Sequence, residues 1–225
     1  MSERKFIIPE FGPLSGMRVV GAGSLIAMPF AASMLAEFGA EVIQIERPSA
    51  GDTYRTFGPL ARDEDGACVG AAWIQEARNR LSMTLELRPD SRDAHEIFLG
   101  LIRESDVFIE NMVWLDKLGI HDDELLRVNP ALVIVHISGF GHREFGGVPE
   151  ICARASYDMI GQAFSGYALY NGYPDRPLPR QGGDRRPEVL DRCVRVRARR
   201  RRCASATSPA KARSWTWPSS RPRPR

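Results

Sequence analysis

The sequence predicts an α/β protein with a doubly wound, mostly parallel sheet of Rossmann-like β-α-β units. The first observation is a strand, helix and strand pattern in the stretch from Met17 to Arg47. The second is that strand and helix patterns alternate again between residues 80 and 137. This alternation is typical of parallel sheets, because two parallel strands need a crossover connection, usually a right-handed one through a helix. With 225 residues, the chain is also long enough to bury a sizeable core.

The first unit begins with a short β-branched strand at Met17–Val20, which is bounded by glycines. A helix should follow, because Pro29 suits a first helical turn, which tolerates a residue without an N–H group. The expected apolar stripe of this helix comprises Phe30, Met34, Leu35 and Phe38. Gly39 should end the helix in a left-handed conformation, and residues 41–46 should form the next strand.

The rest of the pattern continues to a loop at residues 174–183. We expect strands over 80–87, 107–109 and 132–137, and helices over 90–105, 122–127 and 156–168. On the helix over 90–105, the side chains of Ile97, Leu101 and Ile102 should share one face. Residues 53–78 show little periodicity, so we expect an excursion on the active-site side of the sheet.

Ligands of such sheets bind beyond the carboxyl ends of the strands. Two loops, Gly21–Met28 and Glu46–Asp52, should therefore meet on one edge. The first loop offers Gly21 and Gly23 but no third glycine, so the dinucleotide fingerprint is incomplete. An NAD site is accordingly the less favoured interpretation, and glycines that serve only the turn are the alternative.

Charge is unevenly divided along the chain, whose formal net charge is +3 at pH 7. Thirteen Arg and one Lys against Glu188 and Asp191 give residues 185–225 a net charge of +12, which leaves −9 on residues 1–184. We therefore divide the chain into an α/β domain, 1–184, and a basic tail, 185–225. The tail has no apolar face and is expected to be disordered, and binding of polyanions by it is one alternative function.

The cysteines and the apolar runs indicate the cellular compartment. The four cysteines are Cys68, Cys152, Cys193 and Cys203. They have no CxxC spacing and no histidine nearby, which disfavours a metal site or a disulfide framework. Residues 1–13 lack the apolar core of a signal peptide, and no apolar run approaches the roughly twenty residues of a membrane span. We expect a cytoplasmic protein with neither a metal nor a membrane partner.

Several separated motifs occur along the chain in order. They are Phe11–Gly16, Leu35–Ile43, Ile45–Arg47, Asp106–Asn111, Ser138–Gly141 and Gln162–Gly166. Together they resemble the class III CoA-transferases of the carnitine and bile-acid inducible group, with the nearest likeness to L-carnitine CoA-transferases. The likeness covers about residues 10–184 and implies the family's fold in incomplete form. It rests on the order of the motifs, because no single one would suffice.

The resemblance implies an acyl-CoA:carboxylate CoA-transferase that acts on a carnitine-like or other small carboxylic acid. Coenzyme A would enter as the acyl-CoA substrate. The implied nucleophile is Asp184 in the element Gly183-Asp184. Its carboxylate would attack the acyl thioester to give a mixed anhydride and then an aspartyl-CoA thioester. The family also implies an interlocked homodimer and no specific nucleic-acid partner.

The resemblance places coenzyme A across the strand ends. The residues at matching positions are Leu25, Ile26, Arg47, Asn111, Met112 and Lys117. Of these, Arg47 would contact the phosphates, because a guanidinium group offers paired donors to phosphate oxygens. The chain departs from the family at Val113-Trp114, where Pro-Gly is usual.

Other side chains offer alternatives to these assignments. Asp158 is a rival carboxylate, although an aspartate in the middle of a helix is more often a solvated surface residue. His136 is expected to be a satisfied core histidine rather than a catalytic one, and His142 a loop residue. An acyl-CoA racemase of the same fold is a further alternative. The stretch Arg154–Asp158 lacks the His-Asp pair associated with that branch, so the transferase is favoured.

The likeness to the family stops directly after Asp184. Read one base earlier with permitted codons, Lys211–Pro222 spells Gly-Glu-Val-Val-Asp-Val-Ala-Gln-Phe-Glu-Ala, which resembles the family's next motif. This agreement indicates a frameshifted gene. The chain as written is therefore expected to be inactive.

Overall fold

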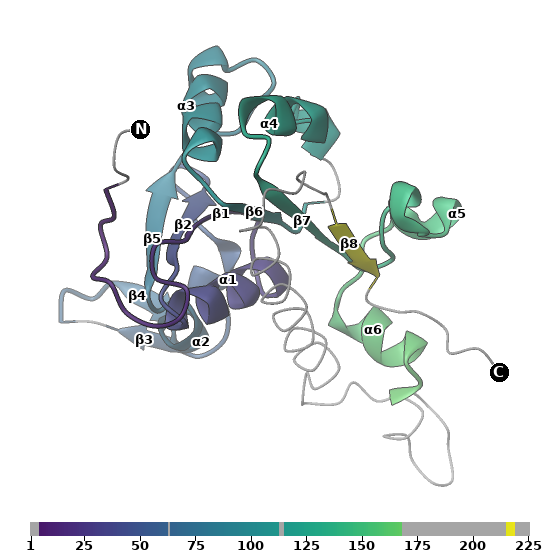
Figure 1. Cartoon of the computed structure of the whole chain (residues 1–225). Helices are drawn as coiled ribbons and strands as arrows, with labels where there is room; N and C mark the ends of the chain where they lie inside the picture. Colours follow the sequence, from purple (N-terminus) through teal and green to yellow (C-terminus); the bar gives the residue numbers. More distant parts are fainter. Residues whose placement is uncertain (1–4, 63, 113–114, 168–214, 219–225) are drawn as a thin grey trace, which may run out of the picture.

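The structure, a computed structural model, describes residues 5–62, 64–112, 115–167 and 215–218. Its centre is a sheet with the strand order β5-β2-β1-β6-β7-β8, in which every pairing between described strands is parallel (Figure 1). The strands are β1 (Arg18–Ala22), β2 (Glu41–Glu46), β5 (Arg80–Thr84), β6 (Val107–Glu110), β7 (Val133–Ser138) and β8 (Trp215–Pro218). The predicted doubly wound, mostly parallel sheet is confirmed.

The strand order places β1 and β6 side by side in the middle of the sheet. From β1 the chain moves outward through β2 to β5, and it then returns to β6 and moves outward the other way through β7. Strands β1 and β6 therefore flank the topological switch point. Loops that follow two such strands diverge, and the crevice between them is where ligands of open α/β sheets bind.

Helices cover both faces of the sheet, with α1 and α2 on one side and α3 and α4 on the other (Figure 1). The helices are α1 (Ala27–Glu37), α2 (Ala71–Glu76), α3 (Arg92–Arg103), α4 (Asp122–Val128), α5 (Pro149–Cys152) and α6 (Asp158–Phe164). Short 3-10 helices are η1 (Thr53–Thr56), η2 (Leu115–Leu118) and η3 (Arg143–Phe145). Successive strand residues point to opposite faces, so Val19 joins the core under α1 and Val20 the core under α3 and α4.

The core face of α1 differs from the predicted stripe. The buried residues of this helix are Met28, Pro29, Ala31, Ala32, Ser33, Leu35 and Ala36. Leu35 is buried as expected, whereas Phe38 is the C-cap residue and 36% exposed. The stripe was misplaced because small alanines, rather than the larger apolar side chains, let this helix lie close to the strands. Gly39 ends the helix region with a φ of 97°, as predicted.

The core under α3 and α4 centres on Phe98 and Phe108, whose rings meet edge to face at 5.4 Å between centroids. Phe98 and Ile102 of α3 are fully buried, whereas Ile97 is 48% exposed. The predicted face of this helix is therefore wrong at Ile97 and right at Ile102. The buried residues of α3, Ala94, Phe98 and Ile102, are four positions apart, as expected for a helix that packs one face against a core.

The excursion over residues 53–78 contains regular structure that its weak periodicity concealed. It holds η1, helix α2 and an antiparallel hairpin of β3 (Leu60–Arg62) and β4 (Cys68–Gly70). Each of these elements is too short for a hydrophobic period to emerge. Trp73 of α2 is buried, and its ring lies beside the guanidinium groups of Arg55 in η1 and Arg80 in β5, which links the excursion to the sheet.

The last described segments correct two further expectations. Helix α6 runs from Asp158 to Phe164, so it is shorter than the predicted helix over 156–168. Strand β8, within the tail that was expected to be disordered, pairs with β7 in parallel, with Val135 opposite Trp215. The rest of the tail, the loop over 174–183 and Asp184 lie outside the described residues.

Candidate functional site

The candidate site is the edge of the sheet at the carboxyl ends of β1, β2 and β6. After β1 the chain turns through Gly23, with a φ of 140°, and Leu25, with a φ of 65°. A positive φ is unusual for a leucine, so local contacts must hold this loop. Leu25 and Ile26 are half-buried here, at the beginning of α1.

Asn111, directly after β6, fixes the loop after β1. Its Oδ1 accepts a hydrogen bond from the Ser24 N–H at 3.2 Å, and its Nδ2 donates to the Ser24 carbonyl at 3.0 Å. A Cβ atom at Gly23 would lie 1.9 Å from Asn111 Oδ1. Only glycine therefore fits beside Asn111, and the two loops at the switch point interlock.

Asp52 joins the same loop to the segment that follows β2. Its Oδ1 accepts from the N–H groups of Leu25 at 2.8 Å and Tyr54 at 2.9 Å, and its Oδ2 accepts from Gln44 Nε2 at 2.8 Å. The Asp52 side chain is buried, and it caps the N-terminus of η1. Sequence reasoning placed Asp52 at the end of a loop but missed this role. The signal in the sequence was an aspartate directly before the first residue of this short helix, which is the N-cap position.

Glu46, the last residue of β2, is the charged centre beneath this loop. It receives two hydrogen bonds of 2.7 Å from Arg55, one of 2.7 Å from Ser82 Oγ and one of 2.7 Å from the Asp52 N–H. Burial acts to raise the pKa of Glu46, but these hydrogen bonds hold its pKa below the usual value. Glu46 is therefore an anion, and its pairing orders the segment that carries Asp52.

The structure brings four of the six candidate coenzyme contacts to this edge: Leu25, Ile26, Arg47 and Asn111. Arg47 follows β2 directly and is exposed. Met112 is half-buried and packs against the core under α3 and α4. Lys117 lies on the exposed side of η2, one element further along the chain.

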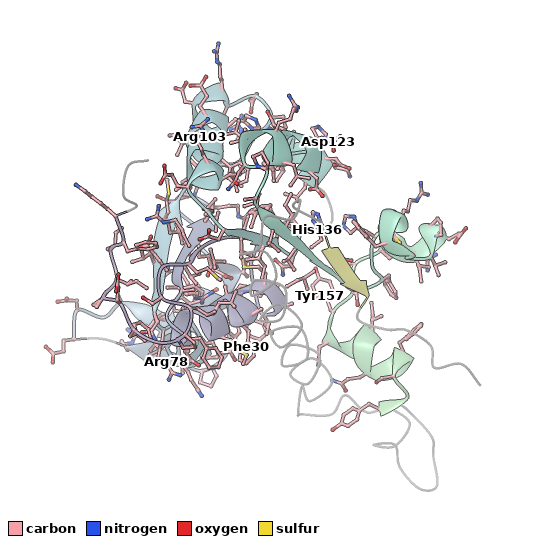
Figure 2. All side chains as sticks on the ribbon, in the orientation of Figure 1. Phe30, Arg78, Arg103, Asp123, His136 and Tyr157 are labelled. Atoms are coloured by element: carbon pink, nitrogen blue, oxygen red, sulfur yellow. The ribbon has the colours of Figure 1, made fainter. Side chains whose placement is uncertain are left out.

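A second polar cluster lies at the ends of β6 and β7, around His136 (Figure 2). The Nδ1 of this buried histidine lies 2.7 Å from Glu110 Oε1, and its Nε2 lies 2.9 Å from Asp122 Oδ2. Burial acts to lower the pKa of His136, but the bonds to Asp122 and Glu110 raise its pKa to about 9. Burial also raises the pKa of Glu110. The prediction of a satisfied core histidine is confirmed, but sequence reasoning missed its two carboxylate partners.

Glu110, His136 and His142 could supply three metal ligands, because their donor atoms lie within 4.8 Å of one another. Two features favour an ion-pair cluster instead. Both ring nitrogens of His136 already face carboxylates. The ring of His142, the N-cap residue of η3, stacks on that of His136 with 28° between the planes, so their lone pairs do not converge on one point.

Asp158 differs from the solvated mid-helix residue that the sequence suggested. It is half-buried in the first turn of α6, and its Oδ2 accepts a hydrogen bond from Gln162 Nε2. Its Oδ1 is buried without a hydrogen-bond partner in the described part of the chain. Among the described residues, no helix has the length and apolar character needed to cross a membrane.

Comparisons with known proteins converge on one family. The model of CoA-transferase family III matches residues 14–184. The chain is 40% identical over 172 residues to the bile acid CoA-transferase BaiK of Clostridium scindens, covering 76% of this chain and 35% of that protein. It is 38% identical over 164 residues to the alpha subunit of the succinyl-CoA–L-malate CoA-transferase of Chloroflexus aurantiacus, covering 72% of this chain and 36% of the relative. The chain thus spans about a third of the length of these relatives.

Solved structures agree with this result. A CAIB/BAIF family protein from Brucella suis superposes with a TM-score of 0.79 at 30% identity, covering 90% of this chain and 52% of that one. A Mycobacterium tuberculosis protein gives the same TM-score of 0.79 at 23% identity, covering 94% of this chain and 56% of that one. The second likeness supports the fold alone.

Proposed function

Because the chain belongs to CoA-transferase family III, we propose that it forms the coenzyme-A-binding part of an acyl-CoA:carboxylate CoA-transferase. The observation that carries the proposal is the interlock of Asn111 with Ser24 at the switch point between β1 and β6. It fixes the glycine-containing loop beside the start of α1. Open α/β sheets receive nucleotide-like ligands at such a position.

Each candidate contact has a chemical role in this proposal. The exposed guanidinium group of Arg47 offers paired donors to coenzyme A phosphates. Leu25 and Ile26 provide apolar surface for the adenine ring, on a loop that Asp52 and Asn111 hold in place. Met112, directly after Asn111, and the exposed cation of Lys117 are further proposed contacts. A preformed loop favours binding because less conformational entropy is lost when the ligand arrives.

Asp184 is the proposed nucleophile. Its carboxylate attacks the acyl-CoA carbonyl, which forms a mixed anhydride and releases the CoA thiolate. The thiolate then attacks the aspartyl carbonyl, which forms an aspartyl-CoA thioester and releases the first carboxylic acid. An incoming carboxylate repeats the two steps in reverse and leaves as the new acyl-CoA. Backbone N–H groups of Gly182 and Gly183 are the proposed donors to the developing oxyanion.

The proposed acceptor is a carboxylic acid, carnitine-like or another small one. The named relatives act on a bile acid and on L-malate, which both carry the carboxylate that this chemistry requires. We further propose a cytoplasmic enzyme that assembles as an interlocked homodimer, with coenzyme A esters as its only cofactor-like ligands and no metal.

The test uses the protein restored to the reading frame inferred for its C-terminal part. Hydroxylamine should modify Asp184 only when acyl-CoA is present, by attack on the activated aspartyl carbonyl. The Asp184→Asn variant should lose transfer by orders of magnitude, while its affinity for acyl-CoA changes by less than about tenfold. The matched control is Asp158→Asn, which removes the rival carboxylate. In this variant hydroxylamine should still modify Asp184. Label on Asp158, or near-native turnover by Asp184→Asn, would show that the wrong carboxylate was chosen.

A further inference from the structure

His136 and Glu110 are direct partners in the register of the parallel strands β7 and β6. Each lies near the carboxyl end of its strand, just before the loops of the candidate site. The Glu110 side chain is 1% exposed, so its carboxylate depends on protein donors rather than on water.

The two carboxylate oxygens of Glu110 have different hydrogen-bond partners. Oε1 faces His136 Nδ1 at 2.7 Å, and Oε2 accepts a hydrogen bond from the Met112 N–H. The second bond closes the turn that carries Asn111. Because Asn111 in turn holds Ser24, a continuous path of contacts leads from His136 to the loop after β1.

The other groups around His136 are Asp122, which stabilises a proton on Nε2, and the ring of His142. Asp122, in the first turn of α4, bonds Nε2 at 2.9 Å, and the His142 ring stacks on the His136 ring with 4.9 Å between centroids. The neighbouring strand β8, with the sequence Trp-Thr-Trp-Pro, contains no titratable residue type. An imidazolium between two carboxylates donates to both of them, whereas a neutral ring can donate to only one.

We propose that His136 is a positioning residue of the coenzyme site: as a cation it fixes the Glu110 carboxylate and, through it, the Asn111–Met112 turn, so that loss of its proton weakens coenzyme A binding. The proposal rests on the proposed function of this edge. The raised pKa of His136, about 9, keeps the cation present at neutral pH. The pKa of Glu110 is raised as well, so the carboxylate becomes protonated more readily in acid. A proton on Oε2 would displace the Met112 N–H, so coenzyme A binding should also weaken at low pH.

The experiment measures hydrogen exchange of the Ser24 and Met112 amides by NMR in the 225-residue chain without ligand. In His136→Gln, these amides should exchange about tenfold faster than in the native chain, because a charge-assisted contact is lost. In the native chain, protection corrected for intrinsic rates should fall as pH rises from 7 through 9.5. The matched control is His95→Gln, which removes a half-exposed histidine from its pair with Glu124 on the outer helices. It should leave both amides unchanged.

Unchanged exchange of the Met112 amide in His136→Gln would overturn the positioning role. If that variant does not fold, the pH series on the native chain decides. Amide protection that does not change between pH 7 and 9.5 would likewise overturn the positioning role. Acetyl-CoA titrations separate the two claims. The native chain should bind more weakly at pH 9.5 than at pH 7, and His136→Gln should show weak binding at both values. Tight binding by His136→Gln overturns the inference alone. If the native chain does not bind acetyl-CoA, the proposed function and the predicted effect on affinity are both wrong. The exchange rates of the Ser24 and Met112 amides then decide whether His136 positions the turn.

Discussion

Asn111 binds both backbone polar groups of Ser24, as acceptor from its N–H at 3.2 Å and as donor to its carbonyl at 3.0 Å. The two residues lie 87 positions apart in the chain, yet they close the switch point of the sheet as one unit. This relationship ties the sequence motif around Asn111 to the glycine loop after β1. Together with Asp52, which accepts from the Leu25 N–H, Asn111 fixes the conformation of that loop.

The fit of Gly23 beside Asn111 gives a prediction for stability. In Gly23→Ala the new methyl group would meet Asn111 Oδ1 at 1.9 Å, at a φ of 140° that favours glycine. The substitution should lower the free energy of unfolding by about 1–3 kcal/mol in urea titrations. Gly100→Ala is the matched control, since Gly100 lies in α3 with open space around it. It should raise stability by about 0.5–1 kcal/mol. Equal effects of the two substitutions would contradict the interlock.

Asp52 should be intolerant of the loss of one acceptor oxygen. In Asp52→Asn, the new amide group would face either Gln44 Nε2 or the N–H groups of Leu25 and Tyr54, so donors would oppose each other. We expect a loss of about 1–3 kcal/mol in the free energy of unfolding. Asp65→Asn, at an exposed position of the β3–β4 hairpin, should change it by less than about 0.5 kcal/mol. A tolerated Asp52→Asn would show that the loop after β1 does not depend on this carboxylate.

Stability should fall on both sides of neutral pH. The folded pKa of His136 is raised to about 9, so its contribution is complete below its unfolded pKa of about 6.5 and is lost as pH rises through 9. The folded pKa of Glu46 is lowered, so its contribution is lost as pH falls below 4.5. Urea midpoints from pH 3 to 10 should show both limbs. His136→Gln should flatten the basic limb, by at most about 3 kcal/mol, and leave the acid limb. An unchanged basic limb in that variant would assign it to another group.

Much of the fold was predictable because it depends on local signals. Runs such as residues 41–46 and 132–137 are rich in β-branched residues, and the helices between the strands indicate parallel crossovers. The core face of α1 was not predictable in detail, since Ala31 and Ala32 are buried by contact with the sheet rather than by their own size. Strand β8 was also missed, although it lies within Lys211–Pro222, the segment that resembles a family motif when it is read one base earlier.

Residues of the candidate site could be named from the sequence only where a motif carried them. Asn111 and Arg47 lie in runs that resemble the family, and both follow strands of the candidate edge. Asp52 and the cluster around His136 have no such signal, because their roles arise from partners that the fold brings together. His136 meets Glu110 only because β6 and β7 pair in one particular register. A one-dimensional pattern does not specify that register.

Titration of the 225-residue chain with acetyl-CoA by isothermal calorimetry tests the central claim, coenzyme binding at the switch point, most directly. We predict that the native chain binds and that Asn111→Ala, which frees the Ser24 loop, weakens binding by about tenfold or more. Gln75→Ala, which removes an exposed amide side chain of α2, should bind like the native chain. A folded native chain that does not bind acetyl-CoA, or an Asn111→Ala variant that binds with unchanged affinity, would contradict the account.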